Sequence, residues 1–336
     1  MKRAIELVAI TSTHCNLRCP GCPEGRKEPL RGGLMSMDMF ERILAKCTAE
    51  CKVMLAQLYF LNEPFLIPHM PQMVEACHRY KVPVLLSTNL TVMRHAPAIL
   101  AQAPEKLMLS VSGWTQENYS KYHRGGNIEE IKKNMVEISK MRKPGCNVQI
   151  SWHRHSYNEH EMPLMQAYAK ELGFSFVSYG TSVLNQKKIL KIWETGIVPE
   201  WANDCLVPPM EAKEMCYKKR HWDCVGQYRS VVVNSMGELM FCSWDDGAEV
   251  QDWSGSLFDT TIDAFFKAHF KDPRCIACKA VGGHVYGSQA YTRSNWSPTR
   301  LAGVLARRLG IEGYIEPVVR KLGLYGHTIL PYARKQ

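Results

Sequence analysis

The chain has 336 residues, of which 46% are hydrophobic and 22% charged, and it carries a formal net charge of +10. A chain of this length can bury a sizeable core, and these hydrophobic and charged fractions are typical of a globular protein. No apolar run reaches the roughly 18 residues of a transmembrane helix, and the start lacks the apolar core of a secretory signal. Thirteen cysteines in such a chain favour metal chemistry in a reducing compartment over disulfides, so we expect a cytoplasmic protein.

A short buried strand is predicted over residues 5–11, which are apolar and rich in β-branched side chains. The loop after it carries three cysteines with three and then two residues between them. We name them the N-terminal cysteine set: Cys15, Cys19 and Cys22. Thiolates suit iron–sulfur clusters or zinc, and three of them leave one position of a four-ligand shell open. From the residues alone, a zinc site and a cluster both remain as interpretations.

This spacing after a first strand resembles the signature loop of the radical S-adenosylmethionine (SAM) superfamily. The resemblance implies that the three thiolates hold a 4Fe–4S cluster whose fourth iron binds SAM. It also implies reductive cleavage of SAM to methionine and a 5′-deoxyadenosyl radical, with electrons from a reductant such as flavodoxin or ferredoxin. In that family an aromatic residue usually precedes the third cysteine, whereas here the residue is Gly21.

The next segment predicts a helix over residues 37–50, capped by Ser36. Its apolar positions share one face: Phe40, Ile43, Leu44 and Cys47. Cys47 and Cys51 stand one helical turn apart, and we interpret them as small buried residues rather than as a metal pair.

A second strand is predicted over residues 53–60, because this apolar run fits a strand covered on both faces. It leads directly into Asn62-Glu63-Pro64. By itself this tripeptide is a strand-ending turn. It also resembles the Gly-Glu-Pro-like motif of radical SAM enzymes, which implies contact with the amino group of SAM.

Polar residues follow the third and fourth predicted strands, over residues 82–86 and 106–111. They are Ser87, Thr88, Asn89, Ser110 and Ser112. Each is by itself an ordinary turn or cap residue, but together they match the positions that contact the SAM ribose in the superfamily. Arg124, in an Arg-Gly-Gly stretch, either clamps the SAM carboxylate or caps its turn.

Further strands over residues 147–152 and 174–179 complete six alternating strand–helix units. The predicted fold is therefore α/β, a partial (βα)6 TIM-like barrel over residues 1–200. The expected remainder is a small β-hairpin/helix domain over residues 201–285 and a basic helical tail over residues 286–336. The stretch from residue 293 to the end carries eight Lys and Arg against two Glu.

A second group of cysteines surrounds a predicted hairpin with an Asn/Gly turn and then a helix. We name it the C-terminal cysteine set: Cys224, Cys242, Cys275 and Cys278. Four thiolates in this order suit structural zinc. The order also resembles the short SPASM-like extension, called twitch, of radical SAM enzymes, which implies an auxiliary 4Fe–4S cluster. Cys205 and Cys216 are left over: either both are free, or one of them replaces an assigned ligand.

The twitch resemblance extends to the butirosin-pathway type of enzyme, which oxidises an aminocyclitol alcohol. It implies dehydrogenation or epimerisation of a small carbohydrate-like or cyclitol substrate. The candidate bases are Asp245, Asp246 and His153, with His155 as a further choice. The two aspartates are equally well explained as a turn, and a lone barrel histidine is often structural.

Two other classes of function remain. Modification of a ribosomal peptide is one, although a cluster loop that begins at residue 15 is expected to leave no room for a leader-binding domain. A non-catalytic zinc or cluster-binding module is the other. The short basic amphipathic segments of the tail indicate either a packed helix pair or peripheral contact with an anionic membrane that carries lipid-linked sugars. No motif indicates nucleic-acid binding.

Overall fold

The computed structural model describes residues 2–23, 25, 30–181, 183, 185–221, 224, 229–244 and 253–287. A nine-stranded sheet organises this part of the chain, in the order β6-β5-β4-β3-β2-β1-β7-β8-β9. The strands are β1 (Ala4–Ala9), β2 (Lys52–Gln57), β3 (Val84–Thr88), β4 (Lys106–Ser110), β5 (Asn147–Arg154), β6 (Ser175–Gly180), β7 (Ser230–Val233), β8 (Glu238–Met240) and β9 (Trp253–Ser256).

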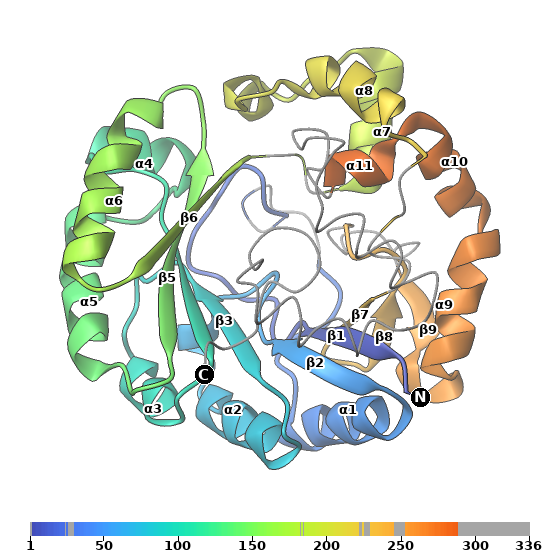
Figure 1. Ribbon diagram of the computed structural model, residues 1–336, viewed down its shortest axis with the longest axis horizontal. Helices are drawn as coiled ribbons and strands as arrows, with labels where there is room; N and C mark the ends of the chain where they lie inside the picture. Colours follow the sequence, from blue (N-terminus) through green and yellow to red (C-terminus); the bar gives the residue numbers. More distant parts are fainter. Residues whose placement is uncertain are drawn as a thin grey trace, which may run out of the picture.

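The first six strands are parallel neighbours in chain order, and helices cover their outer face (Figure 1). The covering helices are α1 (Met37–Glu50), α2 (Met70–Arg79), α3 (Ala96–Ala101), α4 (Gln116–Tyr122), α5 (Ile128–Met141) and α6 (Met162–Glu171). Parallel strands need such crossovers, and strands covered on both faces are apolar throughout. The partial (βα)6 barrel is thus confirmed, and the predicted tail beyond residue 287 lies outside the described residues.

Local sequence explains the start and packing of α1. Ser36 caps it by accepting a hydrogen bond from the backbone N–H of Met39, as its position predicted. The four apolar residues of the predicted face are all buried. Cys47 is fully buried and Cys51 is 4% exposed, which confirms their interpretation as core residues.

The strand β2 ends at Gln57, three residues before its predicted end. The backbone N–H of Phe60 donates instead to the side chain of Asn62, at 3.2 Å. A side chain that competes for backbone hydrogen bonds ends a strand in this way. The Asn-Glu-Pro segment therefore starts in a turn beyond the sheet edge.

The hairpin of β7 and β8 continues the barrel sheet, because β7 pairs in parallel with β1. Its turn is stabilised by Asn234, whose side-chain oxygen accepts from the backbone N–H groups of Met236 and Glu238. Gly237 has a φ of +79°, a left-handed conformation that glycine adopts readily, within the predicted Asn/Gly turn. Cys242 follows β8, which lies between β7 and β9 in the same sheet.

A second core, absent from the sequence predictions, joins distant helices beside the barrel mouth. It packs α7 (Gln186–Thr195) and α8 (Pro209–Lys218) against α11 (Gly283–Gly287). The indole N–H of Trp193 donates to the carbonyl of Pro209, and the hydroxyl of Tyr286 accepts from the N–H of Val183. Buried apolar contacts between these segments therefore fix one wall of the pocket described below.

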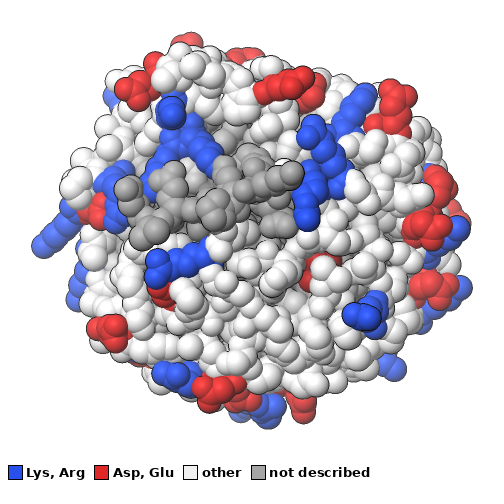
Figure 2. All heavy atoms as spheres, turned by 180° about the vertical axis from the view of Figure 1, so that it is seen from behind, with Lys and Arg blue, Asp and Glu red and all other residues white. Residues whose placement is uncertain are grey.

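Charges of both signs are interspersed around the face seen from behind (Figure 2). On α5 several lysines pair with glutamates one turn away, for example Lys133 with Glu130 at 2.9 Å. Such exposed pairs contribute little stability. Within the described residues, no helix is both long and apolar enough to cross a membrane.

Candidate functional site

The loop of the N-terminal cysteine set lies between β1 and α1, at the edge where the parallel strands end. All three cysteines are partly exposed. The backbone N–H of Arg18 donates to the carbonyl of Arg124 at 2.9 Å, and that of Glu63 donates to the carbonyl of His14 at 3.0 Å. The loop is thus tied to the segments that follow β2 and β4.

Glu63 is 1% exposed, and its carboxylate binds protein groups. It accepts from the hydroxyl of Thr88 and the N–H of Asn89, both at 2.7 Å, and from the N–H of Phe65 at 3.0 Å. Burial raises the pKa of Glu63 to about 7, against the opposing effect of these donors. Glu63 therefore fastens the end of β2 to the end of β3, while Pro64 begins the short helix η1 (Pro64–Leu66).

Asn89 connects this strand end to the cysteine loop. Its amide nitrogen lies 3.6 Å from the sulfur of Cys15 and 3.0 Å from the side-chain oxygen of Asn16. Its oxygen accepts from Thr91, so the orientation of the amide is fixed. One cysteine of the N-terminal set thus has an amide N–H donor directed at its sulfur.

The other predicted SAM contacts are distributed along the same edge. Ser87 and Ser110 are partly buried within β3 and β4. Ser112 is fully buried beyond β4, and its hydroxyl lies 3.3 Å from Nδ1 of His153. Arg124 is exposed, and its backbone carbonyl anchors the cysteine loop.

Three histidines gather beside the cysteine loop, and sequence reasoning singled out only two of them. His123, which it missed, stacks on Tyr119, and its ring centroid lies 6.3 Å from that of His153. Burial lowers the pKa of His153 to about 4 and that of His155 to about 3, and it also holds the pKa of His123 well below its ordinary value. All three rings are therefore neutral near pH 7. The sequence signal that could have identified His123 was its position directly before the Arg-Gly-Gly stretch.

Gly21 faces Tyr122, which explains the missing aromatic residue before the third cysteine. A Cβ at Gly21 would lie 2.6 Å from the hydroxyl oxygen of Tyr122 and 3.4 Å from the ring of Trp201. The first distance is far inside van der Waals contact. The ring of Tyr122, from the end of α4, thus occupies the space beside position 21.

We expect Gly21→Ala to lower iron uptake by the N-terminal set severalfold, because the new methyl group displaces either the loop or Tyr122. Adding Tyr122→Phe removes the clashing oxygen and is expected to restore most of the uptake. Gly33→Ala is the matched control, since a Cβ there meets nothing within 4 Å. Iron content after anaerobic reconstitution measures the effect, and equal uptake by Gly21→Ala and the unaltered protein contradicts this explanation.

The helix α4, which ends in Tyr122, is held at its start by Glu161. This carboxylate is 2% exposed and accepts from the N–H of Trp114 at 2.7 Å and the amide of Asn118 at 2.9 Å. It also accepts from the backbone and hydroxyl of Thr115. Glu161 therefore fixes the helix that presents Tyr122 and His123 to the cysteine loop.

Glu161→Gln is expected to lower the free energy of unfolding by about 2 kcal/mol, because the amide NH₂ then faces N–H donors. Glu159→Gln, two residues away, removes a more exposed ion pair with Arg154 and is expected to cost less than about 1 kcal/mol. Urea unfolding of both variants checks this. Equal losses would mean that the buried carboxylate has no special role in holding α4.

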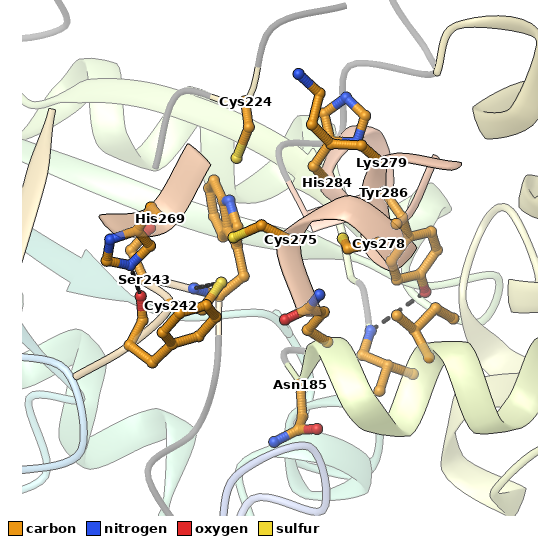
Figure 3. A pocket seen from close by; sticks show the side chains of 16 residues that line it. Asn185, Cys224, Cys242, Ser243, His269, Cys275, Cys278, Lys279, His284 and Tyr286 are labelled. Atoms are coloured by element: carbon orange, nitrogen blue, oxygen red, sulfur yellow. Dashed lines mark hydrogen bonds between the residues drawn. The ribbon is translucent and has the colours of Figure 1, made fainter. Parts of the chain in front are cut away.

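The C-terminal cysteine set lines one pocket of about 610 Å³, including the part open to solvent. Figure 3 shows its four side chains around the same space. Cys275 and Cys278 lie one turn apart on α10 (Pro273–Val281), and Cys242 follows β8. A Cβ at Gly283 would lie 2.9 Å from the sulfur of Cys278, so this wall requires a glycine.

Neighbouring groups hold the pocket in place. His269, on α9 (Ile262–Lys271), bonds through its two ring nitrogens to the carbonyls of Phe241 and Phe265. The backbone N–H of Trp244 donates to the sulfur of Cys242 at 3.4 Å. Asp245 and Asp246, the predicted bases, lie outside the described residues. Cys205 and Cys216 pack in the second core and are absent from the described lining of the pocket.

Neither cysteine set is gathered around a single ion. In the described part of the chain, no three His, Cys, Asp or Glu side chains are close enough to hold one metal ion. A zinc site requires all its thiolates about 2.3 Å from one atom. In a cluster each thiolate binds a different iron, so more widely spaced thiolates fit. The donors at the sulfurs of Cys15 and Cys242 also suit cluster thiolates.

Comparison with known proteins identifies the larger part of the barrel. Residues 9–165 match the model of the Radical SAM superfamily. A "Probable GTP 3′,8-cyclase" of Methanococcus maripaludis is 27% identical over 163 residues, 47% of this chain and 53% of the relative. The chain thus matches about half the length of that protein.

Two solved structures share the fold at low sequence identity. SuiB of Streptococcus suis, bound to precursor peptide SuiA, gives a TM-score of 0.56 at 15% identity, over 83% of this chain and 67% of that chain. The structure of anSMEcpe with bound AdoMet gives 0.53 at 16% identity, over 82% of each chain. The cysteine loop, the open parallel barrel and the match over residues 9–165 together establish that this chain carries a domain of the radical SAM superfamily.

Proposed function

We propose that this protein is a radical SAM oxidoreductase with two 4Fe–4S clusters. The N-terminal cysteine set would hold the cluster that binds SAM, and the C-terminal set an auxiliary cluster. The observation that carries the proposal is the convergence of four cysteines, between residues 224 and 278, on one pocket of a chain with a radical SAM domain. When bound, the SAM-binding cluster and SAM supply a 5′-deoxyadenosyl radical.

The chain's own residues orient and shield this chemistry. Glu63 joins the ends of β2 and β3, and Asn89 directs an amide N–H at the sulfur of Cys15. This arrangement supports a fixed loop, as reactions that depend on the placement of a radical require. The proposed SAM contacts, from Asn62 to Arg124, follow the same strand ends, where barrels of this type bind their substrates.

We propose abstraction of hydrogen from a small carbohydrate-like or cyclitol substrate, free or lipid-linked. Oxidation of a secondary alcohol also needs a base for the hydroxyl proton and an acceptor for one electron. An auxiliary cluster ligated by four cysteines suits the second task, because it has no open iron for substrate. Burial lowers the pKa of His153 to about 4, so its neutral ring is a weak base for this proton, and Asp245 and Asp246 are the alternatives.

The first test is anaerobic reconstitution of the unaltered protein, followed by SAM and a reductant. Two clusters predict about eight irons and eight sulfides per chain, with 5′-deoxyadenosine and methionine formed in equal amounts. Zinc in the C-terminal set would remove the electron acceptor and favour epimerisation or another redox-neutral reaction. Failure of the N-terminal set to bind iron would refute the proposal.

A further inference from the structure

The cysteine loop lies alongside the last residue of α4 and the three residues after it. Tyr122 faces Gly21, and the carbonyl of Arg124 accepts from the N–H of Arg18. A Cβ at Gly125 would lie 3.7 Å from the carbonyl oxygen of Asn16 and 3.8 Å from the side chain of Leu17. Each contact joins residues about a hundred positions apart in sequence. This segment is therefore a second support for the loop, independent of the one that Glu63 and Asn89 provide.

Between these contacts, His123 approaches a cysteine of the N-terminal set. Its Nδ1 lies 3.8 Å from the sulfur of Cys19, within the range of a hydrogen bond to a large sulfur atom. The side chain is 2% exposed, and its other nitrogen, Nε2, has no hydrogen-bond partner among the described residues. A buried N–H without an acceptor is rarer in proteins than an unpaired acceptor. The proton is therefore best placed on Nδ1, directed at the sulfur.

Packing fixes the imidazole in this orientation. Tyr119 stacks on the ring with 4.9 Å between centroids and 18° between planes. Tyr122 contacts it edge-on at 5.3 Å. A ring held on two sides loses little further conformational entropy when it forms a hydrogen bond. The contact with Cys19 is thus built into the end of α4.

We propose that His123 is a positioning residue for the N-terminal cysteine set, whose Nδ1–H donates a hydrogen bond to the thiolate of Cys19. This rests on the proposed function, since it requires a cluster at that set. A donor at a cluster sulfur stabilises negative charge, and the reduced cluster carries one more negative charge than the oxidised cluster. The hydrogen bond therefore raises the reduction potential of the cluster, so that the external reductant transfers its electron to the cluster more readily.

The test is a redox titration of the reconstituted full-length protein, followed by electron paramagnetic resonance. The signal that changes when SAM is added reports the N-terminal cluster. We expect His123→Leu to shift its midpoint potential to a more negative value, with iron content near that of the unaltered protein. His123→Asn retains an N–H near the position of Nδ1 and is expected to restore most of the shift.

His155→Leu is the matched control, because it removes a neighbouring buried imidazole that bonds to Thr181. Its potential is expected to stay near that of the unaltered protein. An unchanged potential in His123→Leu overturns the inference, as do equal shifts in all three variants. Iron uptake by His123→Asn but not by His123→Leu supports it, and loss of iron in both overturns it. Absence of any SAM-sensitive signal in the unaltered protein would instead refute the proposed function.

Discussion

Replacement of Cys15, Cys19 and Cys22 by alanine is expected to abolish 5′-deoxyadenosine formation. The iron content should fall from about eight to about four per chain, because only the auxiliary cluster remains. The three thiolates are the proposed ligands of the SAM-binding cluster, and no other described cysteine lies in their loop. Iron analysis and chromatography of the SAM products measure both effects.

A double variant, Cys51→Ser with Cys146→Ser, controls for the loss of thiols as such. Both residues are buried at the margin of the barrel core, at 4% and 6% exposure. We expect this variant to retain its iron and its SAM cleavage. Retention of eight irons by the triple alanine variant would contradict the assignment of the N-terminal set.

Replacement of Cys224, Cys242, Cys275 and Cys278 by alanine is expected to separate the two halves of the reaction. Iron should again fall to about four, while 5′-deoxyadenosine formation persists at the intact N-terminal set. Oxidised product should disappear, because the substrate radical has lost its electron acceptor. Measurement of product and deoxyadenosine in one sample gives their ratio, which should approach one in the unaltered enzyme and zero in the variant.

Cys205→Ala with Cys216→Ala is the matched control for this set. Both thiols lie in the second core and are absent from the described lining of the pocket. Iron content near eight and an unchanged product ratio are expected. A loss of iron equal to that of the four-cysteine variant would show that one of these two residues is a ligand.

Local sequence patterns were sufficient for most of the barrel. The apolar runs and the helix caps are determined within a few residues of chain, as for Ser36 at α1. The spacing of the N-terminal set also needs no tertiary information, because its thiols lie in one loop. The helices α4, α7 and α8 were not predicted.

In the structure, two residues predicted to contact SAM have protein groups as their partners. Glu63 was assigned to the SAM amino group, yet its carboxylate already accepts three hydrogen bonds from protein groups. Asn89 was assigned to the ribose, and its amide lies against the sulfur of Cys15. Sequence identifies such polar residues at strand ends, but their partners depend on which strands are neighbours.

The sequence by itself determined both cysteine sets, the parallel strand–helix alternation and the resemblance of residues 9–165 to the radical SAM superfamily, because each depends on short spacings along the chain. Only the tertiary structure decided that four cysteines share one pocket, that Tyr122 takes the space beside Gly21 and that His123 faces Cys19. The last two contacts join residues 101 and 104 positions apart. Contacts at such separations follow from the pairing of whole strands and helices, so no local pattern encodes them.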